Sequence, residues 1–112
     1  GREVQTALTA ADILAANGVD ITVVNTRFVM PFDEALMRRQ LDEGMCVVTL
    51  EDHNVTSGFG SIAREFFAGH AHGRLEKLGW PNEILGWGSP AQLRERHGLT
   101  AAAVAERLRQ LL

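Results

Sequence analysis

The densest group of residues able to do chemistry lies in one stretch, TLEDHNVTSGFGS, at positions 49–61. Glu51, Asp52 and His53 follow an apolar run there, and they could supply an acid–base group or hydrogen bonds at the edge of a cleft. The interpretation we favour is that they cap a strand end and meet a neighbouring domain, because fold position alone does not establish a site. A triad of Ser57, His53 and Asp52 is disfavoured, since hydrolase triads do not assemble from residues adjacent in sequence.

Two glycines, Gly58 and Gly60, flank Phe59 where a helix is expected to begin. Free backbone N–H groups at a helix N-terminus can hold an anion, so this turn is a candidate phosphate site. The turn lacks the third glycine and the downstream acid of the dinucleotide fingerprint. We therefore favour close packing of the helix against the preceding strand, with Phe59 in the core.

The histidine pair and the single cysteine are weaker candidates for a functional site. His70 and His72 could bind a metal, but two ligands in a loop are too few for a structural zinc site, and a solvated loop is favoured. Cys46 lies in an apolar run, which predicts a small buried side chain. A single cysteine cannot form an internal disulfide, which fits a reducing cytoplasm.

The elements that must position these residues alternate between helical and strand patterns. Residues 19–24 and 45–50 are apolar, β-branched runs, and the second is continuous, which predicts burial on both faces. Asp33, Ser89-Pro90 and Thr100 are expected helix starts. The expected helices span 2–17, 34–43, 61–68, 91–97 and 101–112, and the expected strands span 19–24, 45–50 and 74–78. Such alternation predicts an α/β fold of three layers, with helices on both faces of a mostly parallel sheet.

Residues 81–88 are expected to be irregular. Ile84, Leu85 and Trp87 are predicted to anchor this segment in the core.

Length and charge limit the classes of function. A chain of 112 residues is expected to form one domain. A net charge of −3 gives no electrostatic footprint for nucleic acid. No apolar run approaches the ~20 residues of a membrane span, and the first residues lack the apolar segment of a signal peptide. A cytoplasmic protein without a membrane or nucleic-acid partner is therefore predicted.

Four blocks of sequence together resemble one family. They are AADILAANGVDITVVNTRFVMPFD at 10–33, VVTLEDHNVTSGFGS at 47–61, LGWPNEILGWGS at 78–89 and the tail from Leu93 onward. In this order they resemble the C-terminal domain of the transketolase superfamily, and in particular that of the 1-deoxy-D-xylulose-5-phosphate synthase family. Two departures stand out. Asn82 occupies a position that is usually Asp, and Ser57-Gly58 replaces a common Gly-Gly pair.

The resemblance implies a place within a larger enzyme. Family members join pyruvate, after decarboxylation, to glyceraldehyde 3-phosphate, using thiamine diphosphate and Mg²⁺ bound by the preceding domains. The matching domain contributes to domain assembly and to a homodimer, so this chain is expected to bind neither cofactor and to be inactive alone. Gly1 matches the glycine that ends a central strand of the family sheet. We therefore expect an N-terminally truncated sheet, whose gap is closed by direct pairing of the remaining strands or by another chain.

The resemblance implies roles for two arginines. Arg94 matches a family arginine that lies near a bound anion in some members, although a surface arginine on an amphipathic helix is slightly favoured. Arg27 matches a basic position, where a salt bridge would anchor the loop into Pro31.

Three functional hypotheses follow. The chain is the C-terminal assembly domain of such a synthase. Alternatively, it is the small subunit of a split transketolase-like or 2-oxoacid dehydrogenase enzyme, or a stand-alone anion-binding module that uses Gly58 and Gly60.

Overall fold

The computed structural model describes residues 1–69 and 74–112, which divide into two compact units. One unit comprises residues 1–25 and 83–112, and the other comprises residues 26–82. No helix within the described residues is long and apolar enough to cross a membrane.

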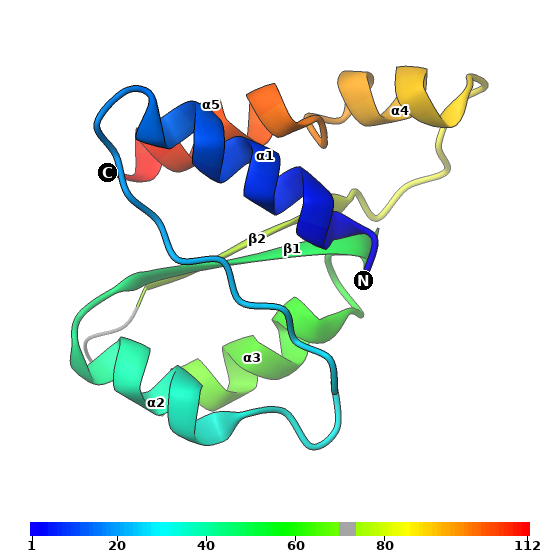
Figure 1. The fold of residues 1–112 in the computed structure, drawn as a ribbon. Helices are drawn as coiled ribbons and strands as arrows, with labels where there is room; N and C mark the ends of the chain where they lie inside the picture. The colour runs from blue at the N-terminus through cyan, green and yellow to red at the C-terminus, as the bar shows by residue number, and fades with distance from the viewer. Residues whose placement is uncertain (70–73) are drawn as a thin grey trace. The chain divides into compact units, whose positions relative to one another are not determined.

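The first unit contains three helices, α1 (Glu3–Ala15), α4 (Pro90–Arg96) and α5 (Ala101–Leu111). Helices α1 and α5 lie side by side (Figure 1). The buried apolar side chains of this unit are Ala10, Leu14, Leu99, Val104 and Ala105. Ser89 forms a capping box with Gln92 at the start of α4, and the Thr100 hydroxyl accepts a hydrogen bond from the Ala103 N–H at the start of α5. Both predicted helix starts are confirmed.

The second unit is built on a parallel pair of strands. It contains α2 (Glu34–Asp42), β1 (Cys46–Asn54), α3 (Phe59–Ala68) and β2 (Arg74–Trp80), with α2 and α3 on the same face of the strands (Figure 1). The carboxylate of Asp33 accepts the Leu36 N–H at 2.9 Å, which confirms it as the cap of α2. The buried apolar residues are Leu41, Ala63 and Phe67. Phe32 meets Phe59 and Phe66 edge-on, with ring centroids 5.7 and 5.5 Å apart.

The α/β class and the parallel strand pairing are confirmed, but the strand count is wrong. Residues 19–24 form no strand, although their composition favours one. A strand requires a neighbour to accept its backbone hydrogen bonds, and the described residues of the first unit contain no other strand. Direct pairing of the three expected strands is therefore not observed, because the sheet in the described residues consists of β1 and β2.

The ends of β1, α3 and β2 differ from the predicted ones. Strand β1 runs to Asn54, so Glu51, Asp52 and His53 belong to the strand rather than to a loop after it. Helix α3 begins at Phe59 instead of Ser61, and β2 continues to Trp80. The glycine turn is thus the first turn of the helix.

Three burial predictions are wrong. Cys46 is exposed because it is the first residue of β1. Strand β1 is not buried on both faces: Thr49 and Glu51 are buried, and its remaining residues are half-buried or exposed.

Ile84 and Trp87 are also fully exposed instead of anchoring a core, while Leu85 is half-buried. Trp87 lies between Gly86 and Gly88, which both lie beside side chains of α4.

Candidate functional site

Glu51 is the centre of the polar residues at the end of β1. Its side chain is buried, and its Oε1 atom accepts a hydrogen bond from the Gly60 backbone N–H at 2.8 Å. Gly60 lies in the first turn of α3, where N–H groups have no partner within the helix. A carboxylate there is also favoured by the helix dipole. The Glu51 carboxylate therefore occupies the helix start that the glycine pattern made a candidate phosphate site.

The two glycines of this turn make room for that carboxylate. A Cβ atom on Gly58 would overlap Glu51 Oε2. A Cβ on Gly60 would lie 2.5 Å from Thr49 Oγ1 and 2.6 Å from Glu51 Oε1. Both positions require glycine because the helix start and β1 approach so closely. Phe59, between them, is half-buried against Phe32.

Lys77 and Thr49 complete this arrangement, and sequence reasoning missed both. They are direct partners in the β1–β2 register. The Lys77 ammonium donates to the Val55 carbonyl at 2.5 Å and to Ser61 Oγ at 3.2 Å, which ties β2 to the start of α3. The Thr49 hydroxyl is buried and has no hydrogen-bond partner among the described residues. We call Thr49, Glu51, Gly58, Gly60 and Lys77 the strand-end cluster.

Asp52 and His53 do not join the strand-end cluster. The register of β1 against β2 is irregular between Leu50 and Asn54, and both side chains are exposed. Asp52 Oδ1 accepts the Trp80 indole N–H at 2.8 Å, and His53 Nδ1 lies 3.3 Å from the Asn54 carbonyl oxygen. Glu51 is therefore buried at the start of α3, whereas Asp52 and His53, which follow it in the sequence, are exposed.

The disfavoured triad has no support in the geometry. Ser57 is exposed, and no hydrogen bond joins its hydroxyl to His53 within the described residues.

Asn54 organises the turn that follows β1. Its Oδ1 accepts the Thr56 backbone N–H at 2.8 Å and the Thr56 hydroxyl at 2.6 Å. Its Nδ2 donates to Asn82 Oδ1 at 2.9 Å. Because Asn82 acts here as an acceptor, the aspartate usual at this position would serve the same bond.

Arg94 lies in the first unit and is engaged inside it. Its Nη2 donates to Glu3 Oε2 at 2.7 Å and to the Leu99 carbonyl at 2.9 Å. Both charged side chains are nearly buried, with 12% and 8% of their surface exposed. Arg94 therefore holds α4 and the following turn to α1 and is not a surface arginine. Arg27, by contrast, is exposed, and no ion pair joins it to another described residue.

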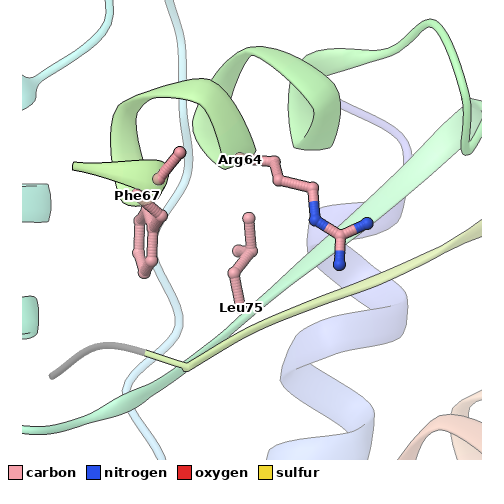
Figure 2. A pocket seen from close by; sticks show the side chains of 4 residues that line it. Arg64, Phe67 and Leu75 are labelled. Atoms are coloured by element: carbon pink, nitrogen blue, oxygen red, sulfur yellow. The ribbon is translucent and has the colours of Figure 1, made fainter. Parts of the chain in front are cut away.

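A shallow hollow of about 260 Å³ lies beside α3, lined by Arg64, Phe67, Ala68 and Leu75. Figure 2 shows Arg64 to one side of Leu75 and Phe67 to the other. Its lining includes neither the strand-end cluster nor any candidate residue named from the sequence.

The described residues do not fit a site for thiamine diphosphate and magnesium. Among residues 1–69 and 74–112, no three His, Cys, Asp or Glu side chains lie close enough to hold a metal ion. The helix start that could face a diphosphate is filled by Glu51. His70 and His72 lie outside the described residues.

Comparison with known proteins defines the class of this chain. The sequence model of the family described as "Transketolase, C-terminal domain" matches residues 1–104. A solved structure titled "Split gene transketolase, inactive beta4 tetramer" superposes with a TM-score of 0.86 at 32% identity, covering 98% of this chain and 36% of that one. The chain belongs to the transketolase C-terminal domain family.

Within that family, the chain is similar to 1-deoxy-D-xylulose-5-phosphate synthases. The 1-deoxy-D-xylulose-5-phosphate synthase of Geobacillus thermodenitrificans is 37% identical over all of this chain. The corresponding enzyme of Symbiobacterium thermophilum is 41% identical over 92% of it. The matches span only 18% and 16% of those relatives, so this chain corresponds to the C-terminal domain of a much longer synthase. The resemblance drawn from the four sequence blocks is confirmed.

Proposed function

We propose that this chain is the C-terminal assembly domain of a thiamine-diphosphate-dependent synthase that forms 1-deoxy-D-xylulose 5-phosphate from pyruvate and glyceraldehyde 3-phosphate. In this role it acts in the cytoplasm as part of a homodimer, joined to the domains that bind thiamine diphosphate and Mg²⁺. The observation that carries the proposal is the match to synthases along the whole chain, in which it represents under a fifth of the enzyme.

The internal use of the charged candidate residues supports an assembly role. Glu51 caps α3, Asp52 accepts a hydrogen bond from Trp80, and Arg94 is paired with Glu3. These groups hold the chain's own elements together, because each of them makes a hydrogen bond to another residue of the chain. The thiamine chemistry is accordingly assigned to the domains outside this chain.

Complementation tests this proposal. The 112-residue chain and the preceding part of the synthase are produced separately and mixed, and formation of 1-deoxyxylulose 5-phosphate is measured. We expect no turnover from the chain alone and recovery of turnover on mixing. Turnover by the chain alone, or full turnover by the remainder without it, would contradict the assigned role.

A second candidate is a separately encoded small subunit, favoured by the similarity to a chain from a split-gene transketolase. The reading frame upstream of Gly1 distinguishes the two: a continuous frame with a GDG-type diphosphate motif supports the fused synthase. Calorimetry with phosphate, nucleotides and thiamine diphosphate tests the anion-binding alternative, which requires binding below millimolar concentration.

A further inference from the structure

Two large apolar side chains stand fully in solvent within four residues of each other. Ile84 is 100% exposed and Trp87 is 99% exposed, whereas Leu85 between them is half-buried. An isolated exposed apolar residue needs no explanation, but a paired Ile and Trp with complete exposure indicates an interaction surface. Tryptophan is also among the residues most enriched in binding hot spots.

The segment carrying these side chains lies beside side chains of α4. A Cβ on Gly86 would lie 3.2 Å from Arg96 Nη1, and a Cβ on Gly88 would lie 3.5 Å from Leu93 Cγ. The Ser89 capping box follows directly and fixes the start of the helix. Trp87 is therefore carried by a segment that lies beside α4 and ends at a fixed helix start, which lowers the conformational cost of docking.

We propose that Ile84 and Trp87 form a docking anchor that inserts into an apolar pocket on the preceding domains of the same synthase polypeptide. This inference rests on the proposed function and identifies the surface through which the assembly role is carried out. A stable complex between free chains needs about 800 Å² per partner, much more than two side chains supply. A tethered partner needs far less, because a covalent link raises its effective concentration to the millimolar range. The synthases that match this chain carry more than four-fifths of their length outside it, so a tethered partner is available.

Hydroxyl-radical footprinting of the full-length synthase tests the anchor directly. Oxidation of Trp87 is measured by mass spectrometry in the native enzyme and after unfolding in urea. Docking buries the side chain and slows its native oxidation about tenfold, as expected for a hot-spot tryptophan. Leu112, which is 76% exposed in the same unit, serves as the internal reference and shows little protection. Protection of Trp87 no greater than that of Leu112 would overturn the proposal.

Substitutions provide the second measurement, and Leu112→Ser is the matched control. Trp87→Ser shifts the docking equilibrium about 30-fold toward the undocked state, the effect of truncating a buried anchor. Limited proteolysis of the full-length enzyme then releases a C-terminal fragment correspondingly faster, while Trp87→Phe largely restores resistance. Because Trp87 makes no core contact, the circular dichroism of Trp87→Ser should match that of the wild type. Equal release from Trp87→Ser and Leu112→Ser would contradict the anchor.

Two further outcomes separate the hypotheses. Protection of Trp87 that rises with protein concentration would identify a second copy as the occupant, and the proposal would be wrong. Wild-type enzyme that makes no 1-deoxyxylulose 5-phosphate would refute the proposed function, whereas the footprint of Trp87 is measured without turnover. The two failures are therefore distinguishable.

Discussion

Replacing Gly60 by alanine tests whether the strand-end cluster is built around a buried carboxylate. In an ordinary helix the change would stabilise the chain by up to about 1 kcal/mol, because alanine is the better helix former. Here the new Cβ would lie 2.5 Å from Thr49 Oγ1, 2.6 Å from Glu51 Oε1 and 2.8 Å from Lys77 Cδ. These separations are well inside van der Waals contact, so the neighbours or the helix must move.

The size of the effect follows from two losses. Overpacking of this kind typically costs about 1–3 kcal/mol. Displacing Glu51 also breaks its hydrogen bond to the Gly60 N–H, and bonds to charged groups contribute about 1.5–3 kcal/mol. After the gain in helix propensity, we expect Gly60→Ala to lower the free energy of unfolding by about 2–4 kcal/mol.

Urea unfolding followed by circular dichroism measures this change, with Gly69→Ala as the matched control. Gly69 caps the other end of α3 with an ordinary φ of −87°, and a Cβ there meets nothing within 4 Å. The control should differ from the wild type by less than about 0.5 kcal/mol. In a Glu51→Ala background, the cost of Gly60→Ala should fall by at least about 1 kcal/mol, because one of the clashing groups is gone. A stable Gly60→Ala, or an unchanged cost in that background, would refute the reasoning.

The other predictions concern the first unit. Arg94→Ala should cost about 3–5 kcal/mol in urea unfolding, because it leaves the Glu3 carboxylate buried and unpaired; the double variant Glu3→Leu with Arg94→Met should recover most of this loss. Ser89→Ala removes the capping box and should cost about 1 kcal/mol in the same assay, while leaving helix content nearly unchanged. The hydrogen bond from Arg109 lowers the pKa of Glu106 below its ordinary 4.5, so its stabilisation is present above pH 4.5 and is lost as the pH falls through the lowered pKa. The difference in melting temperature between wild type and Glu106→Gln should therefore shrink below pH 4.5, and a difference that grows would contradict this sign.

Local patterns predicted the helices because their signals lie within a few residues. Asp33, Ser89 and Thr100 each cap the helix that follows them, and each acts on a backbone N–H three residues away. The strand at 19–24 failed for the opposite reason. Its β-branched composition is local, but a strand exists only where another strand pairs with it.

The partners of the charged residues could not be predicted, because they lie far away in the sequence. Glu3 and Arg94 are 91 positions apart, and nothing in one sequence links them. Lys77 lies in the expected strand 74–78, but its pairing with Thr49 depends on the register of β1 against β2, which the sequence alone does not determine. From that position in β2 the Lys77 ammonium reaches Ser61 Oγ at the start of α3.

The turn from Gly58 to Gly60 shows why a glycine pattern cannot identify an anion site by itself. Glycines at a helix start permit close approach by any negatively charged group, whether it is a phosphate or a carboxylate from the same chain. What distinguishes the two cases is an acid that can reach the turn from the preceding strand. Glu51 is such an acid, nine residues before Gly60, and its buried carboxylate accepts the Gly60 N–H at 2.8 Å. A phosphate could bind at this helix start only by displacing that carboxylate. The same residues that suggested ligand binding thus fix α3 to the strands.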